Sequence, residues 1–285
     1  MTCPLDRRDE VRRLLAMSPA AVRRRAGDRL VVLPDVDALH EHFAEELAGE
    51  IEANERRGRW TNLILPVGPT GQYPLLAERI NRRGISLKRC RFFMMDELCD
   101  ENGVELPASH PLSFRRALHE LLLERIRRPL RPAGKNVVFP TRDNVHRLAE
   151  RIERSGGIQT AYGGIGIHGH VAFNEPEPHV RDSEPRLVYL NEFTRTINAI
   201  RARIGGNLEG YPRKALTLGM RQILEARRVR LYCRNGIALD WANTVLRLAL
   251  LGTPGDDYPV TYLREHPDCV IVTDEQTLAS PENVV

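Results

Sequence analysis

Residues 162–176 include the residue types that acid–base chemistry requires. Four of residues 163–169 are glycine, His168 and His170 flank the last glycine, and Glu175 follows. Glycine lets the backbone adopt positive φ and approach a ligand closely. A tight turn alone does not need two imidazoles and a carboxylate so close together. We therefore predict that this segment is a catalytic loop, with a purely structural turn as the alternative.

A second candidate for acid–base chemistry is the adjacent pair Asp96 and Glu97. They follow an apolar segment, residues 91–95, which we expect to be a buried strand. A carboxylate at the tip of a buried strand loses hydration, and this cost must be offset by a partner or by a chemical role. The pair therefore predicts a catalytic carboxylate, with a helix cap as the alternative.

A third loop has a form that can bind phosphate. Residues 62–66 are typical of a buried strand, residues 67–71 contain two glycines, and residues 73–81 are typical of a helix. This order presents backbone N–H groups to an anion at the N-terminus of the helix. It is not a Walker A sequence, because no Gly-Lys-Ser/Thr follows. An ordinary strand–helix turn is the alternative.

The elements that must position these loops alternate along the chain. The alternation of strand-like and helical segments predicts an α/β fold, in which a mostly parallel sheet has helices on both faces. Ligands bind at the carboxyl ends of the strands in such sheets, where the three loops lie. We expect one domain over residues 29–285, preceded by an N-terminal helical and charged segment over residues 1–28.

The composition is that of an ordinary globular protein, with 42% hydrophobic and 28% charged residues. The net charge of +4 comes from arginines interleaved with acids, which is not the pattern of a nucleic-acid-binding surface but suits an anionic small substrate. We expect no membrane partner, because no apolar run is long enough to span one. The five cysteines form no CxxC pair and the first residues lack a signal-peptide core, so we expect a cytoplasmic protein.

Taken together, these loops resemble those of the glucosamine-6-phosphate deaminase (isomerase) family. The matches are Met-Asp-Glu at 95–97, His-Pro-x-Ser-Phe at 110–114, the glycine-rich segment 164–176 with its Phe-Asn-Glu-Pro ending, Pro-Arg-Lys-Ala-Leu-Thr at 212–217 and Asp-Glu at 274–275. The related 6-phosphogluconolactonases lack the Phe-Asn-Glu-Pro run. The resemblance implies a Rossmann-like fold, no cofactor or metal, a homo-oligomer, and conversion of glucosamine 6-phosphate to fructose 6-phosphate and ammonia.

The resemblance also implies roles for individual residues. Asp96 would be the base that moves a proton between C2 and C1 of the sugar. His170 would open the sugar ring, and Glu175 would orient its imidazole. The phosphate would be held by backbone N–H groups and guanidinium forks, from Gly68, Thr70, Gly71, Arg195 and Arg213.

This chain departs from the family pattern at three positions. His168 stands where the family has an aspartate, and an imidazole cannot stabilise the cation of His170 as a carboxylate does. Pro69 stands in the phosphate loop and has no N–H to donate. Arg213 replaces a lysine and keeps the charge.

Three other functions remain open on the residues alone. One is a hydrolase of the 6-phosphogluconolactonase type. Another is a metal-assisted enzyme, in which His168 and His170 with Glu175 or Asp96 form an open three-ligand site. The third is a sugar-phosphate-binding protein with altered or lost activity, which the change at His168 suggests.

Overall fold

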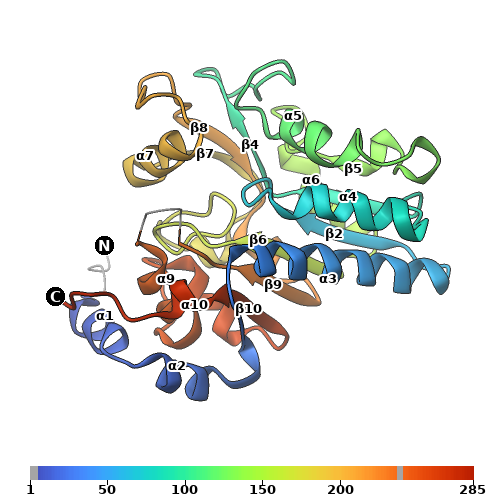
Figure 1. Ribbon diagram of the computed structural model, residues 1–285. Coiled ribbons are helices and arrows are strands. Elements are labelled where there is room, and N and C mark those ends of the chain that lie inside the picture. The colour runs from blue at the N-terminus through green and yellow to red at the C-terminus, as the bar shows by residue number, and fades with distance from the viewer. Residues whose placement is uncertain (1–5, 236–239) are drawn as a thin grey trace.

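A parallel sheet of seven strands forms the centre of the computed structural model, which describes residues 6–235 and 240–285 (Figure 1). The strand order is β1-β10-β9-β6-β2-β3-β5. The strands are β1 (Leu30–Leu33), β2 (Thr61–Leu65), β3 (Cys90–Met94), β5 (Val137–Val138), β6 (Thr160–Gly164), β9 (Arg228–Tyr232) and β10 (Cys269–Asp274). The predicted α/β fold with a parallel sheet is confirmed.

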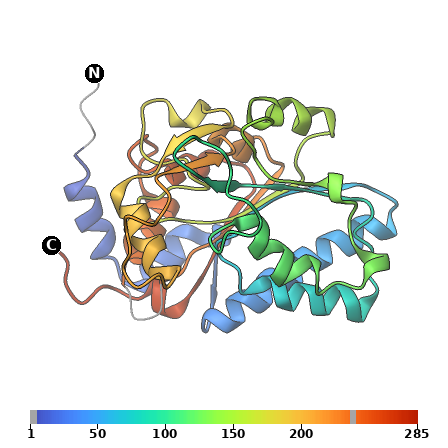
Figure 2. The same cartoon turned by 90° about the horizontal axis from the view of Figure 1, so that it is seen from above.

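Helices cover both faces of this sheet, and the view from above shows the strands running between them (Figure 2). One face packs against α3 (Val36–Arg56), α4 (Gln72–Arg83), α5 (Phe114–Leu118) and the π-helical turn η2 (His119–Leu123). The other packs against α2 (Pro19–Ala26), α6 (Leu148–Arg154), α8 (Met220–Leu224), α9 (Ala242–Leu251) and α10 (Glu275–Leu278). Short 3-10 helices complete the connections: η1 (Gly27–Arg29), η3 (Arg128–Leu130), η4 (Gly134–Asn136), η5 (Val145–Arg147), η6 (Val180–Asp182) and η7 (Pro259–Glu265).

The N-terminal part of the described chain is more regular than we expected. After α1 (Arg8–Leu15), the charged segment forms a second helix, α2, whose first turn is capped by the Ser18 hydroxyl. Both helices pack against α9. Within the described residues, no helix is both long and apolar enough to cross a membrane.

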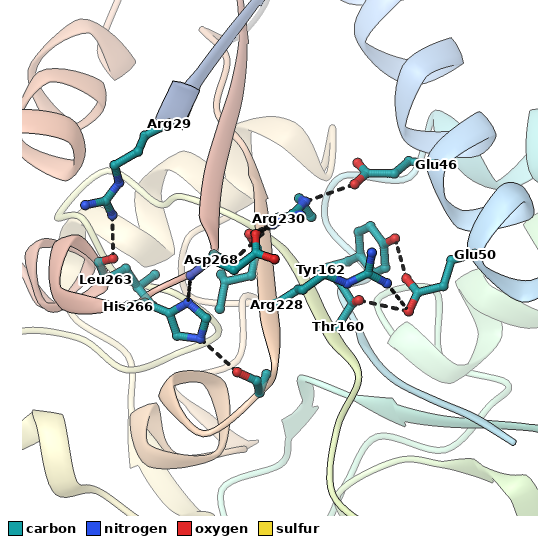
Figure 3. Close-up of polar contacts among 12 residues, drawn as sticks. Arg29, Glu46, Glu50, Thr160, Tyr162, Arg228, Arg230, Leu263, His266 and Asp268 are labelled. Carbon is teal, nitrogen blue, oxygen red and sulfur yellow. Dashed lines mark hydrogen bonds and ion pairs between the residues drawn. The ribbon is translucent and has the colours of Figure 1, made fainter. Parts of the chain in front are cut away.

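Two carboxylates tie the long helix α3 to the large sheet (Figure 3). The Glu50 side chain, 5% exposed, accepts a hydrogen bond from the Tyr162 hydroxyl at 2.8 Å and forms an ion pair with Arg228 at 2.6 Å. Glu46, one turn earlier, accepts from Arg230 at 3.0 Å. These contacts fix α3 across β6 and β9, so the position of the helix does not depend on apolar packing alone.

A second, antiparallel sheet of three strands begins where β3 ends. Its strands are β4 (Asp96–Cys99), β8 (Lys214–Thr217) and β7 (Arg186–Tyr189), with β8 in the middle. Met95 connects the two sheets, because its N–H donates to Leu65 at 2.9 Å and its carbonyl accepts from Leu218 at 2.8 Å. We expected Asp96 and Glu97 at the tip of the strand before them; they instead begin β4, because Met95 directs the chain into the second sheet. The helix α7 (Glu192–Arg201) packs on this small sheet.

Candidate active site

A cavity of about 300 Å³ lies at the carboxyl ends of β2, β3 and β6, bounded by β4 and α7. It is lined by Pro66, Val67, Gly68, Met95, Asp96, Leu98, Leu112, Phe114, Gly164, Ile165, Gly166, His170, Ala172, Phe173, Asn198, Arg201, Ala202 and Tyr211. The loops predicted after β2 and β6 therefore meet at one site, together with the predicted carboxylate Asp96.

A larger groove of about 580 Å³ lies on the surface between α6 and α8. Its charged residues are mostly acidic, with Glu150, Glu153, Glu184 and Glu225 beside Arg221. The predicted catalytic side chains are not part of that lining, and an acidic groove repels anionic ligands. The cavity at the carboxyl ends of the strands is therefore the candidate site, although its volume is smaller than that of the groove.

The glycines after β6 allow the catalytic loop to fold back on itself. A methyl group at Gly166 would lie 1.9 Å from Nε2 of His170, so the imidazole packs against the loop backbone only because residue 166 is glycine. Gly169 has φ +64 and faces Tyr258. At Gly164, a methyl group would lie 3.2 Å from the carbonyl oxygen of Gly68. The motif thus brings the loops after β2 and β6 into contact.

His170 is buried and neutral over most of the pH range. Burial, with smaller contributions from His168 and Arg201, lowers its pKa to about 3. Its Nδ1 atom is buried without a hydrogen-bond partner in the described part of the chain. A neutral imidazole lining the cavity can accept a proton from a ligand hydroxyl.

Glu175 is half-buried, in the same loop as His170. Its Oε2 accepts the backbone N–H of Asn191 at 2.7 Å, and burial raises its pKa. Its Oε1, like Nδ1 of His170, is buried without a partner among the described residues. The predicted contact between the two side chains is therefore not formed in this structure, although neither atom has another partner there.

His168 lies beside His170 but outside the cavity wall. Its Nδ1 lies 3.3 Å from the Asn191 side-chain nitrogen, and its ring packs against Phe193 with centroids 4.6 Å apart. Burial lowers its pKa. Because Asn191 also binds Glu175 through its backbone, one residue links both neighbours of His170.

Asp96 and Glu97 have different partners although they are adjacent in β4. The Glu97 carboxylate is fully buried and accepts the N–H groups of Phe114 and Arg115, both at 2.8 Å. It therefore caps α5, which is the alternative that the sequence left open for this pair. Asp96 lines the cavity, and burial together with the charge of Glu97 raises its pKa to about 8.

The loop after β2 forms one end of the cavity. Gly68 lines it, Thr70 accepts the Tyr73 N–H at 3.0 Å, and Gly71 precedes the first turn of α4. A methyl group at Gly71 would lie 2.3 Å from the His40 ring, so this glycine is required for packing. Thr70 and Gly71, predicted to hold phosphate, are not among the lining residues, although they join Gly68 to the N-terminus of α4.

The two arginines predicted to hold phosphate do not line the cavity. Arg195 is 4% exposed and bonds the Leu208 carbonyl at 2.9 Å, so it supports the loop before β8. Arg213 is exposed and pairs with Glu209 at 2.8 Å. The arginine that does line the cavity is Arg201, the last residue of α7.

Sequence reasoning also missed Asn198 and Tyr211, which line the cavity beside Arg201. Asn198, Arg201 and Ala202 follow the three- and four-residue spacing of one helix face. That spacing is visible in the sequence, but it does not say which face of the helix meets the site. Nothing in the sequence around Tyr211 marks it as a site residue.

Among residues 6–235 and 240–285, no group of three His, Cys, Asp or Glu side chains is arranged to hold a metal ion. His168 and His170 differ in placement, since only His170 lines the cavity. The open three-ligand arrangement considered from the sequence is not formed by the described residues.

Comparisons with known proteins agree with the resemblance seen in the motifs. The chain is 32% identical to glucosamine-6-phosphate deaminase of Caenorhabditis elegans over 207 residues, 70% of this chain and 74% of that protein. It is 30% identical to the Aliivibrio fischeri enzyme of the same name over 257 residues, 87% of this chain and 90% of the relative. No family model matches the chain.

Solved structures show the same fold. A monomeric glucosamine-6-phosphate deaminase superposes with a TM-score of 0.76 at 22% identity, covering 87% of this chain and 98% of that one. The 6-phosphogluconolactonase of Trypanosoma brucei superposes with a TM-score of 0.61 at 20% identity, covering 88% and 97%.

Proposed function

We propose, for a chain that belongs to the glucosamine-6-phosphate deaminase family, that it converts glucosamine 6-phosphate or a close hexosamine 6-phosphate to the ketose 6-phosphate and ammonia. The observation that carries the proposal is the pairing of two buried groups at one cavity. Asp96, with a pKa of about 8, is present in both protonated and ionised forms near neutral pH. His170, with a pKa of about 3, stays neutral there. A carboxyl group that titrates near the working pH suits reversible proton transfer.

The proposed reaction begins with ring opening. His170 takes the proton of the C1 hydroxyl and returns one to the ring oxygen, which leaves an open-chain aldehyde. Glu175 accepts a hydrogen bond from Nδ1–H of His170 and so holds the ring in the tautomer whose Nε2 is free to take a proton. The support for this role is that Nδ1 and Oε1 are each buried with no other partner among the described residues.

Asp96 then moves a proton from C2 to C1. Because the C1 oxygen also gains a proton and the amino group loses one, the product is the imine of the ketose. Water then adds to its C2, and ammonia leaves as the C2 carbonyl forms. Each transfer uses the same carboxylate, which therefore returns to its starting state. We assign the phosphate to the other end of the cavity, at Gly68 and the N-terminus of α4, with Arg201 as the charged side chain.

The experiment that tests the proposal measures ammonia release from the 6-phosphates of glucosamine, galactosamine and N-acetylglucosamine, with 6-phosphogluconolactone hydrolysis in parallel. We expect release from a free hexosamine 6-phosphate that depends on Asp96. Hydrolysis of the lactone without ammonia release from any amino sugar would refute the proposal in favour of the lactonase.

A further inference from the structure

Tyr211 is a buried residue in the wall of the cavity that also holds the proposed catalytic base. It is 4% exposed, and its ring packs in the core of the small sheet with Leu98 and Phe173. It nevertheless lines the cavity with Asp96 and Asn198. Burial and the negative charge of Asp96 raise the pKa of Tyr211, while a hydrogen bond with Asn198 acts in the other direction. The phenol is therefore neutral and keeps its proton at every pH of interest.

The loop that carries Tyr211 is held in place by Arg195 of α7. The Tyr211 N–H donates to the Leu208 carbonyl at 3.2 Å, and Arg195 donates to the same oxygen at 2.9 Å. Arg195 is itself fixed by Glu192 at 2.7 Å. The buried guanidinium thus sets the position of the loop, and the aromatic ring enters the cavity wall with little freedom to rotate.

We propose that Tyr211 is a specificity-determining residue whose hydroxyl donates a hydrogen bond to the oxygen on C1 of the substrate, beside Asp96. This inference rests on the proposed function, because it takes a sugar 6-phosphate as the ligand. When Asp96 removes the C2 proton, negative charge develops on the C1 oxygen, and a fixed neutral donor stabilises it.

The test is a cycle that removes the hydroxyl from the protein and the oxygen from the ligand in turn. Binding of glucose 6-phosphate, and of 1,5-anhydroglucitol 6-phosphate, which lacks the C1 oxygen, is measured by calorimetry with the full chain and with Tyr211→Phe. We expect Tyr211→Phe to raise the Kd of glucose 6-phosphate about tenfold, and the Kd of the analogue by less than about twofold. Tyr262→Phe is the control. The Tyr262 hydroxyl donates to Asp256 at 2.9 Å, and Tyr262 does not line the cavity.

Each outcome decides the inference. Equal weakening of both ligands would show that Tyr211 only shapes the cavity, and no weakening would show that its hydroxyl does not contact the ligand; either overturns it. If the wild type releases ammonia from glucosamine 6-phosphate, Tyr211→Phe should lower kcat more than it raises KM, because the bond strengthens in the transition state. Failure of the wild type to release ammonia from any hexosamine 6-phosphate would refute the proposed function, and this inference with it.

Discussion

Asp96 and Glu97 are consecutive residues of one strand, yet the structure gives their carboxyl groups opposite surroundings. Glu97 is satisfied by the backbone of α5, while Asp96 faces the cavity with its pKa raised to about 8. Their side chains point to opposite faces of β4, as alternation along a strand requires. The buried charge of Glu97 therefore influences the proposed base without competing for its proton.

Asp96→Asn should abolish turnover and leave sugar-phosphate binding within about tenfold, because a proton-transfer base acts in chemistry more than in ground-state binding. In the wild type, kcat/KM should rise with pH up to about 8, as Asp96 ionises. Steady-state kinetics and calorimetry measure both. Turnover of more than a few per cent in the Asn variant would assign the base elsewhere.

The same carboxyl group also predicts how stability depends on pH. Its folded pKa of about 8 lies above the ordinary value of 3.8, so the folded state binds more protons between these values. Its contribution to the free energy of unfolding is therefore lost as the pH rises toward 8. Urea unfolding of wild type and Asp96→Asn at pH 5 and pH 9 should show a smaller loss at high pH in the variant.

Glu97→Gln should move the pH–rate limb of Asp96 to lower pH, because the charge that helps to raise this pKa is removed. It should also lower the free energy of unfolding by about 2–3 kcal/mol, since an amide cannot accept from both backbone donors of α5. Glu105→Gln, in the next loop, is the control. A limb that stays in place while stability falls would show that Glu97 is only a cap.

His168→Asp should raise the pKa of His170 from about 3, because a carboxylate replaces an imidazole that disfavours the cation. NMR titration of the His170 imidazole should show this upward shift, whereas the acidic limb of kcat/KM is set by Asp96, whose pKa of about 8 lies higher. His168→Asn also removes the imidazole but adds no charge, and should raise the pKa of His170 less than His168→Asp does. Identical His170 titrations for the Asp and Asn variants would mean that position 168 does not act through charge.

Arg201→Ala should weaken the binding free energy of glucosamine 6-phosphate by about 1.5–3 kcal/mol and so raise its Kd. The Kd of glucosamine, which has no phosphate, should hardly change. Arg213→Ala, an exposed arginine outside the cavity wall, should change neither Kd. Arg195→Ala should lower Tm and weaken both ligands together, because it releases the loop at Leu208. A phosphate-specific loss at Arg195 instead of Arg201 would contradict the assignment.

Glu50→Ala should destabilise the fold by about 2–3 kcal/mol without changing kcat at low temperature. The change removes the carboxylate that the Tyr162 hydroxyl and Arg228 share, and none of these three residues lines the cavity. Glu52→Ala, on the same helix with ion pairs of 3.7 Å and 3.8 Å, should cost less than about 0.5 kcal/mol. Chemical denaturation of the two variants side by side measures the difference.

The sequence alone determined the parallel sheet, the helices on its faces and the loops at the carboxyl ends of β2 and β6. These features follow from local patterns. Apolar residues of α3 recur with the period of a helix, and Leu39, Phe43, Leu47 and Ile51 are all 1% exposed or less. The glycines before His170 likewise predicted a loop that approaches a ligand, because their conformational freedom is a property of the residue itself.

The tertiary structure decided which side chains reach the cavity. Arg195 and Arg201 lie on one helix, six residues apart, and both are typical of a phosphate ligand by residue type. Only the docking of α7 on the small sheet places Arg201 at the cavity and Arg195 beneath the loop of Tyr211. In the same way, the antiparallel sheet turns Asp96 inward and Glu97 toward α5. Such choices depend on contacts between segments far apart in the chain, and periodicity within one segment does not determine them.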